Sequence, residues 1–437
     1  MHTNEIQSFV GGRWISGGGQ AVISVCPAFP DRVIAEGLAA GPAEFDEAAA
    51  AARAAQPGWA AMSLHERGAI LSHAAAVVDR NADAWGLELA AEEGKTKAEG
   101  IAEVRRAAQI LRYYGNEGDR QTGEIFSSPR RGEHILVTRK PLGVVGVITP
   151  FNFPIAIPAW KIAPALVYGN AVLWKPASTV PLLAMRLAQA FDAAGLPAGV
   201  LNLVVGDTGV GDAMVNDSRV DAVTFTGSTG VGRRIAAAGA ARGIPVQAEM
   251  GGKNAAVVLD DADVDLAVEQ VLLGAFRSTG QKCTATSRLV LTEGIADAFL
   301  SLLRIARTRW LSVIPPQTTP KWARWSASPR SARSPRGSAA RSHRVRSPLP
   351  VGTATGTAPW PPATSSRRPS WNSVRERWTS GPRNYSARFW RCAAPQTPRR
   401  RSGWRTTVST VCPQRYSQKT SPELCRRSTT WTWASCM

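Results

Sequence analysis

The chain has 437 residues, enough for two or three domains with cores of their own, and its formal net charge is +19. The charge is unevenly placed: residues 304–437 carry 26 Lys and Arg against two acidic residues, whereas residues 1–303 have a net charge of −5. The first part is therefore not a basic nucleic-acid-binding protein, and no apolar run reaches the roughly 18 residues that a membrane span needs.

The first strongly patterned region, residues 43–115, is predicted to be helical. It is rich in Ala, and its apolar residues recur at the spacing of a helix face. The period then changes. Short β-branched runs such as "VVGVITP", "NAVLWKP" and "AVTFTG" end in Gly or Pro and alternate with helical segments. This alternation predicts an α/β fold with a doubly wound parallel sheet, which binds ligands at the carboxyl ends of its strands.

We expect the helices and this sheet to form a dinucleotide-binding domain over residues 1–250. A second strand–helix–loop–strand pattern begins at "NAAVVLDDADVDLAVEQVLLGAF" and fades after "GIADAFLSLL". Residues 251–303 are therefore predicted to be the start of a catalytic α/β domain that is incomplete.

The sequence "FTGSTGVGRR" places glycines around a turn from a strand into a helix. Gly227, Ser228 and Gly232 belong to this turn, and backbone N–H groups at a helix start favour phosphate. The pattern is not Gly-x-Gly-x-x-Gly, so a tight turn without a ligand is an equally simple interpretation.

Three further residues have side chains suited to catalysis. Cys283, in a polar loop, could be a thiolate nucleophile or a structural thiol. Glu249, at a strand end before two glycines, could activate water or be a solvated acid. Asn152, just after a strand, could donate to an oxyanion or simply occupy a turn.

The combination of these motifs resembles the aldehyde dehydrogenase superfamily. "TPFNFP", "WKPAS", "FTGSTGVG", "EMGGKN" and "GQKC" occur in the family's order, and the resemblance runs from about residue 8 to residue 303. The resemblance implies that the Cys283 thiolate attacks an aldehyde, while Asn152 and the Cys283 backbone N–H hold the oxyanion. It also implies that Glu249 activates the water that hydrolyses the thioester. Relatives that transfer the acyl group to coenzyme A generally lack this glutamate.

The resemblance further implies a nicotinamide cofactor held by Lys175, Ser178 and the Gly227–Gly232 turn. NAD-preferring members often have Glu where this chain has Ser178, and a carboxylate there would repel a 2′-phosphate. The expected cofactor is therefore NADP or NAD.

The segments "FNFPIAIPAWKIAPAL" and "FRSTGQKCTATSR" look most like bacterial α-ketoglutarate-semialdehyde (2,5-dioxovalerate) dehydrogenases. A carboxylated semialdehyde is the expected substrate, and Arg277 could neutralise its carboxylate or be structural. Succinate semialdehyde and less polar aldehydes remain open. The family implies a homo-oligomer, although an incomplete catalytic domain counts against one.

The tail does not continue the family's pattern. The expected Met-Gly-Pro and Glu-x-Phe-Gly-Pro motifs are missing, but "KWARWSAS" and "RNYSARFWRC" can both be back-translated so that one shifted reading frame encodes them. We therefore interpret residues 304–437 as an out-of-frame, disordered tail, and expect the chain as written to be inactive. The alternatives are a non-catalytic dinucleotide-binding remnant and a nucleic-acid-binding tail, although no specific nucleic-acid partner is expected.

The six cysteines do not show the spacing of a metal or disulfide site. Cys26 and Cys283 lie in the first part, and the other four lie in the tail without any Cys-x-x-Cys pair. No metal is expected. The N-terminal segment "MHTNEIQSFVGG" lacks a basic-then-apolar signal pattern, so we expect a cytoplasmic protein without membrane association.

Overall fold

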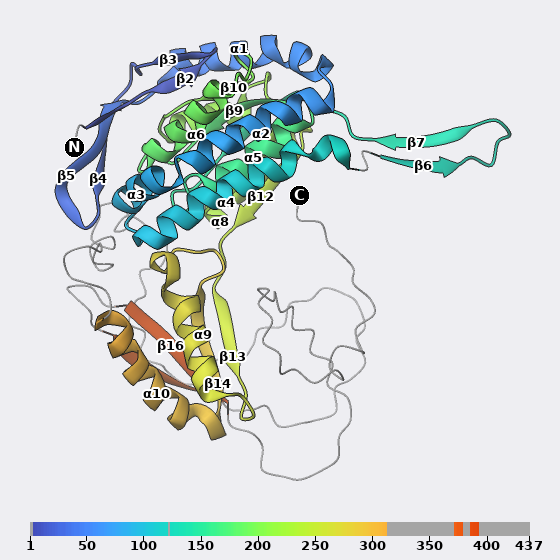
Figure 1. Cartoon of the computed structure of the whole chain (residues 1–437). Coiled ribbons are helices and arrows are strands. Elements are labelled where there is room, and N and C mark those ends of the chain that lie inside the picture. Colours follow the sequence, from blue (N-terminus) through green and yellow to red (C-terminus); the bar gives the residue numbers. More distant parts are fainter. Residues whose placement is uncertain (1–2, 121–122, 313–370, 379–384, 393–437) are drawn as a thin grey trace. The chain divides into compact units, whose positions relative to one another are not determined.

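A seven-stranded sheet lies at the centre of residues 3–250 (Figure 1). The computed structural model describes residues 3–120, 123–312, 371–378 and 385–392. The strand order is β12-β11-β8-β9-β10-β2-β3. The first five strands are parallel, β2 is antiparallel to β10, and β3 is antiparallel to β2. The bounds are β2 (Ser8–Val10), β3 (Arg13–Ile15), β8 (Val144–Ile148), β9 (Ala171–Lys175), β10 (Leu201–Leu203), β11 (Ala222–Gly227) and β12 (Val246–Met250).

Helices cover both faces of this sheet. Along β9, Val172 and Trp174 enter one hydrophobic core, whereas Ala171 and Leu173 enter the other, as the alternation of a strand requires. The first core contains residues of α2 (Leu64–Arg80), α3 (Ala82–Glu93), α4 (Lys97–Gly115), α5 (Ala156–Val167) and α6 (Pro181–Ala193). The second contains residues of α1 (Pro42–Ala61), α7 (Thr208–Asn216) and α8 (Thr229–Arg242). The predicted doubly wound α/β architecture is confirmed.

Local signals in the sequence explain where the N-terminal helices begin and end. Ser63 with Glu66 and Thr96 with Glu99 form capping boxes at the starts of α2 and α4. Helix α3 ends at Gly94, whose φ of 89° belongs to the left-handed region. These caps fix the start of α4.

The sequence pattern does not predict two smaller sheets that lie outside the seven-stranded sheet. Strands β1 (Asn4–Ile6), β5 (Phe29–Leu38) and β4 (Ala21–Cys26) form a three-stranded sheet in that order. Strands β6 (Gly123–Ser127) and β7 (His134–Thr138) form an antiparallel hairpin whose residues are exposed or half-buried (Figure 1).

Among the described residues, none of the helices has the length and apolar character needed to cross a bilayer.

A second α/β unit follows β12. Its strands β13 (Asn254–Val258) and β14 (Thr286–Thr292) are parallel, and α9 (Val264–Phe276), the 3-10 helix η2 (Arg277–Gly280) and α10 (Glu293–Ser312) accompany them. This unit has its own core, which includes Val258, Leu272, Leu289 and Phe299. The expected domain limits at 250/251 and 303/304 stay predictions, and α10 continues past residue 303.

Two strands lie within the tail that was expected to be disordered. Strand β16 (Tyr385–Cys392) pairs in parallel with β14, and β15 (Trp371–Trp378) pairs antiparallel with β16. For these two segments the structure differs from the expectation, because β16 completes the ladder at the edge of β14 and β15 in turn pairs with β16. Apart from these strands and the end of α10, the predicted basic tail lies outside the described residues.

Candidate functional site

The predicted site residues of the first region lie along one edge of the seven-stranded sheet. Asn152 follows β8, Lys175 ends β9 and Ser228 follows β11. Glu249 is the last residue but one of β12. These four strands are neighbours in the order β12-β11-β8-β9, and all are parallel. Their carboxyl ends therefore meet at the edge where doubly wound sheets bind ligands.

Two glycines of the turn after β11, Gly227 and Gly232, lie close against neighbouring side chains. A Cβ atom on Gly227 would lie 2.5 Å from the Phe225 ring, and one on Gly232 would lie 2.7 Å from the Met250 sulfur. Ser228 is the N-cap residue of α8, and its side chain makes no capping hydrogen bond. The turn thus brings bare backbone N–H groups to the sheet edge, which suits the phosphates of a dinucleotide.

A groove beside this turn was missed by the sequence analysis. It lies between α7 and α8 and combines an apolar floor with polar groups at its rim. Its lining residues are Asp212, Val215, Asn216, Val231, Arg234, Ile235 and Ala238. The i, i+4 pair Val231 and Ile235 was the available signal, but helical spacing alone cannot distinguish a groove from a core.

Lys175 and Ser178 lie between β9 and α6, next to the start of α7. Lys175 is buried, its ammonium group donates to the Pro176 carbonyl at 3.3 Å, and its aliphatic chain lies against Gly211. Ser178 is half-buried. A lysine and a hydroxyl, rather than a carboxylate, therefore occupy the positions predicted to meet the adenosine ribose.

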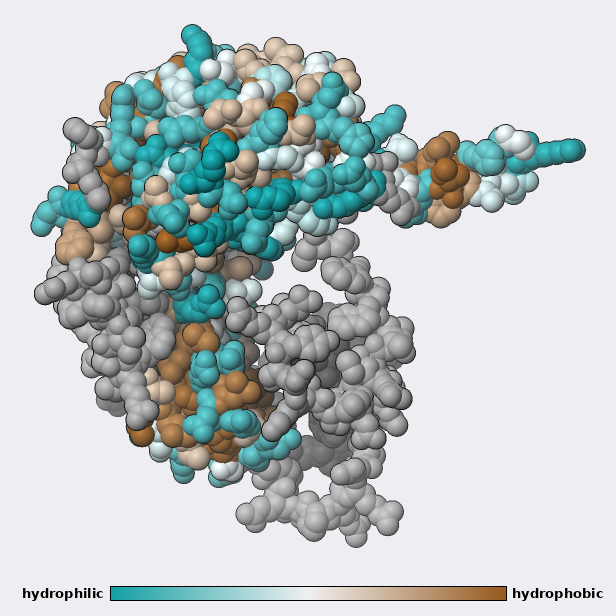
Figure 2. Space-filling view, viewed as in Figure 1, coloured by the Kyte–Doolittle hydropathy of each residue, from teal (hydrophilic) through white to brown (hydrophobic). Residues whose placement is uncertain are grey.

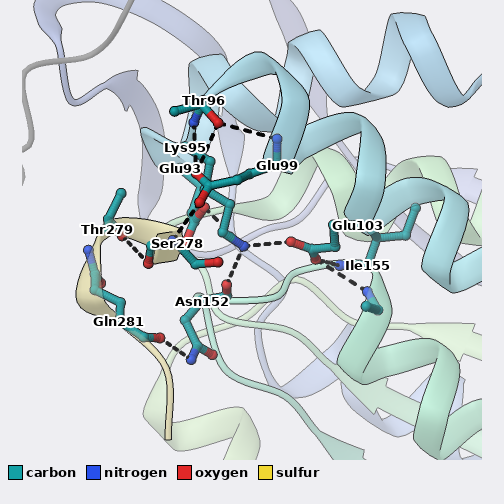
Figure 3. Close-up of polar contacts among 11 residues, drawn as sticks. Glu93, Lys95, Thr96, Glu99, Glu103, Asn152, Ile155, Ser278, Thr279 and Gln281 are labelled. Carbon is teal, nitrogen blue, oxygen red and sulfur yellow. Dashed lines mark hydrogen bonds and ion pairs between the residues drawn. The ribbon is translucent and has the colours of Figure 1, made fainter. Parts of the chain in front are cut away.

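Asn152 connects the first region with the loop that carries the cysteine. Its side-chain amide nitrogen donates to the backbone carbonyl of Gln281, two residues before Cys283 (Figure 3). Its amide oxygen is buried and has no hydrogen-bond partner among the described residues. Because a carboxamide nitrogen has two N–H groups, one can hold the loop while the other donates to a ligand.

Cys283 is exposed in the loop between η2 and β14. The loop backbone is held by Asn254, whose side-chain amide donates to the Cys283 carbonyl at 2.6 Å. Ser278 and Thr279, which precede the loop, have φ values of 51° and 57°, and such left-handed conformations are unfavourable for residues other than glycine. No hydrogen bond within the described residues joins the thiol of Cys283 to Asn152 or Glu249.

Glu249 is exposed and accepts a hydrogen bond from the Gln247 side chain at 3.2 Å. A second charged side chain, Lys161, interacts with Glu249, and the sequence pattern does not single it out. Lys161 of α5 is buried, and its ammonium donates to Thr224 Oγ1 at 2.7 Å and to Gln247 Oε1 at 3.0 Å. Burial lowers the pKa of Lys161 to about 8, although the charge of Glu249 acts in the opposite direction.

Basic groups surround the cysteine loop. Burial, followed by repulsion from Arg277, lowers the pKa of Lys282, the residue before Cys283. Arg277 itself is exposed at the start of η2. Its predicted contact with a substrate carboxylate stays a prediction. Within the described residues, no cluster of three or more His, Cys, Asp or Glu side chains could hold a metal ion.

Comparison with known proteins points to one family. The profile described as "Aldehyde dehydrogenase family" matches residues 14–321. The α-ketoglutaric semialdehyde dehydrogenase of Bacillus subtilis (strain 168) is 43% identical over 312 residues, which are 71% of this chain and 64% of that protein. The chain thus matches less than two thirds of the length of this curated relative.

Solved structures agree with this comparison. The NADP-dependent glyceraldehyde-3-phosphate dehydrogenase of Bacillus halodurans C-125, solved in complex with NADP, has a TM-score of 0.66 at 34% identity and covers 70% of this chain and 65% of its own. An NAD-dependent benzaldehyde dehydrogenase of Corynebacterium glutamicum has a TM-score of 0.65 at 36% identity, covering 69% of this chain and 66% of its own. Neighbours of this fold therefore use NAD or NADP.

Proposed function

Because the chain belongs to the aldehyde dehydrogenase family, we propose that its site oxidises an aldehyde to a carboxylic acid through a thioester on Cys283. The observation that carries this proposal is the hydrogen bond from the Asn152 amide to the backbone of Gln281. It brings a side chain suited to oxyanion binding next to the loop of the nucleophile.

In the first step, the Cys283 thiolate adds to the aldehyde carbon and the carbonyl oxygen becomes an oxyanion. The Asn152 amide and the Cys283 backbone N–H stabilise that oxyanion, and loss of one such donor typically lowers the rate by about 10²–10³. Glu249 later takes a proton from the water that hydrolyses the thioester. The charge of Glu249 in turn acts on Lys161, whose pKa it raises against the larger lowering effect of burial.

The cofactor site fits a dinucleotide on the observations above. The start of α8 with Gly227 and Gly232 would hold the phosphates, Lys175 and Ser178 would meet the adenosine ribose, and the groove between α7 and α8 would take the base. Bound NAD(P)⁺ supplies a hydride acceptor, and loss of hydride from the hemithioacetal leaves the thioester. Because Ser178 carries no charge, the site tolerates a 2′-phosphate.

The substrate we propose is a carboxylated semialdehyde such as α-ketoglutarate semialdehyde. The identity to the Bacillus subtilis relative supports this class. The exposed guanidinium of Arg277, six residues before Cys283, supplies a positive charge beside the nucleophile loop.

We further propose that the family sequence continues in another reading frame after a frameshift near residues 304–315. The family match ends at residue 321, and over a third of the Bacillus subtilis relative has no counterpart here. On this account the chain as written is inactive. The nucleotide sequence across codons 300–325, read independently, tests this step.

A non-catalytic dinucleotide-binding protein is the second candidate. One observation favours it: the seven-stranded sheet is covered on both faces, whereas the second sheet exposes apolar side chains such as Val257. In that case, nucleotide would bind without aldehyde-dependent reduction.

The partner proposed for the hairpin β6–β7 is a second copy of the chain. The side chains of Ile125 and Leu136 are 73% and 66% exposed, and Figure 2 shows hydrophobic residues gathered on this hairpin. Exposed apolar patches of this kind mark interaction sites. Loss of the oligomer in Leu136→Glu, measured by sedimentation, would support the proposal. Location in the cytoplasm stays a prediction.

The activity is tested with the frame-restored protein. We expect reduction of NADP or NAD with α-ketoglutarate semialdehyde, and no turnover in Cys283→Ala. A fully active Cys283→Ala variant would remove the assigned nucleophile. Equal kcat/KM values for the semialdehyde and for an uncharged aldehyde of the same length would remove the substrate class.

A further inference from the structure

A buried lysine just before α4 holds the backbone of the candidate oxyanion residue. The Lys95 side chain is 1% exposed, and its ammonium donates to the Asn152 carbonyl at 2.7 Å and to Glu103 Oε2 at 2.6 Å (Figure 3). It also lies 3.9 Å from the centre of the Phe153 ring. Lys95 therefore contacts two consecutive residues of the Asn152 loop.

Glu103 continues this support on the other side of the loop. Its second oxygen, Oε1, accepts the backbone N–H groups of Ile155 and Ala156, both at 3.3 Å, where α5 begins. The Asn152 segment is thus held at its carbonyl by Lys95 and three to four residues later by Glu103.

The same helix also holds the nucleophile loop. Glu99, one turn along α4, accepts the Ser278 backbone N–H on Oε1 at 2.7 Å, while its Oε2 accepts from the Thr96 cap. Ser278 has left-handed backbone geometry, which is unfavourable by roughly 1–3 kcal/mol for a residue of this kind. The hydrogen bond from Ser278 to Glu99 helps to keep that conformation.

Stability alone does not explain this cluster. Glu93 lies 3.3 Å from Lys95, and burial raises the pKa of Glu93 well above its ordinary value. Burial disfavours the charged form of Lys95, but Glu103 and Glu93 outweigh it and raise the pKa of Lys95. Buried ion pairs of this type often stabilise a fold less than apolar side chains of similar size would. What the cluster does fix is the position of two loops.

We propose that Lys95 and Glu99 are positioning residues that set where the Asn152 amide lies relative to the loop of Cys283. Lys95 fixes the Asn152 backbone, and Glu99 fixes the start of the loop that Asn152 itself contacts through Gln281. The inference rests on the proposed function, because it takes Asn152 as the oxyanion donor and Cys283 as the nucleophile.

The test compares two reactions of Cys283 in the full-length chain. With p-nitrophenyl acetate, the thiolate adds to the ester carbonyl, an oxyanion forms, and p-nitrophenolate leaves as the thioacetate is made. With iodoacetamide, the thiolate displaces iodide and no oxyanion forms. Peptide-resolved mass spectrometry measures both adducts at Cys283, so the other cysteines do not contribute.

For Lys95→Met we expect acylation of Cys283 to fall about 10–100-fold, since a misplacement of about 1 Å can lower a rate roughly 10²-fold. Alkylation should stay within about twofold of the parent rate. The matched control is Lys97→Met, because Lys97 is exposed at the start of α4, two residues after Lys95. It should leave both rates unchanged.

Glu99 provides a second series in case Lys95→Met does not fold. Glu99→Ala should lower acylation selectively, whereas Glu99→Gln keeps an acceptor for Ser278 and should restore most of it. Ser63→Ala removes the equivalent cap at the start of α2, where the Ser63 side chain accepts from Glu66 rather than Glu99. It should therefore leave the ratio of acylation to alkylation unchanged.

A double-mutant cycle separates this inference from the proposed function. In an Asn152→Ala background, Lys95→Met should change acylation less than twofold, because its effect passes through Asn152. If Asn152→Ala lowers acylation and the Lys95 and Glu99 variants do not, the positioning proposal is wrong and the proposed function stands. If Asn152→Ala has no effect on the acylation of Cys283, both are wrong.

Discussion

Strand β9 of the seven-stranded sheet is buried along its whole length, whereas β13 of the second sheet is exposed at most of its positions. Both are parallel strands with apolar sequences, and parallel strands are normally covered on both faces. Val257 and Leu259 are 62% and 53% exposed, and Figure 2 shows hydrophobic residues at the surface around α9.

The buried charged groups show the same contrast. Glu92, Lys95, Glu103, Lys161 and Lys175 are all buried in the first region, and the buried polar residue described after residue 250 is Ser278. The first region thus has the dense packing that can hold charges in fixed positions. Cys283, by contrast, lies in the region whose described strand β13 is mostly exposed, so we expect nucleotide binding and catalysis to be separable in this chain.

The largest expected effect comes from restoring the reading frame. We expect the chain as written to bind NADP but to show no aldehyde-dependent reduction, because Cys283 lies in the unsupported region. The frame-restored protein should turn over at rates ordinary for enzymes, about 1–10³ s⁻¹. Calorimetric titration of NADP and steady-state kinetics on both proteins check this. Turnover by the chain as written would mean that the exposure of the second sheet does not prevent catalysis by Cys283.

A matched pair of truncations tests the difference in packing. Leu173→Ala in β9 should lower the free energy of unfolding by about 2–5 kcal/mol, because a fully buried side chain leaves a cavity. Val257→Ala in β13 should lower it by at most about 1 kcal/mol, since that side chain is mostly exposed. Urea unfolding of the full-length chain measures both. Equal losses would show that β13 is covered.

The buried charge of Glu92 predicts a pH dependence that belongs to the first region. Burial raises the pKa of Glu92 to about 7, so between about pH 4.5 and 7 the folded protein holds a proton that the unfolded chain has lost. Stability therefore falls as the pH rises through this window, by about 3 kcal/mol in total. Glu92→Gln should remove this slope. An unchanged slope in urea titrations of the variant would assign the dependence to other groups.

A smaller effect is expected for cofactor choice. Ser178→Glu should weaken NADP relative to NAD by about tenfold, because its carboxylate would repel a 2′-phosphate. The ratio of the two Kd values, measured on the chain as written, reports on the first region alone. Ser178→Gln is the control, with similar size and no charge. A similar shift in both variants would indicate a steric effect.

The sequence predicted the elements whose apolar period extends over many residues. The helices within residues 43–115 and the strands β8, β9 and β11 lie where the pattern placed them. The three-residue strands β1, β2 and β3 were missed; β2, for example, is defined by its pairing with β10, almost two hundred residues later. Such pairing leaves no local signal.

The residues of the candidate site also fall into two groups, those that the sequence indicated and those that it did not. Asn152 and Cys283 lie in loops and Glu249 lies near the end of β12, where a polar side chain stands out against apolar neighbours. Lys95 and Lys161 lie at or within helices whose charged residues usually face solvent, so only the three-dimensional packing reveals that they are buried. The charge count of the whole chain misleads until the tail is considered separately.

The central claim is that Cys283 carries the acyl group during aldehyde oxidation. The most direct measurement uses the frame-restored Glu249→Gln variant, mixed with α-ketoglutarate semialdehyde and NADP or NAD and quenched with acid. We predict one equivalent of reduced cofactor and an acyl adduct on the peptide that contains Cys283, because hydrolysis of the thioester is blocked. Reduced cofactor without an adduct on that peptide would contradict the account.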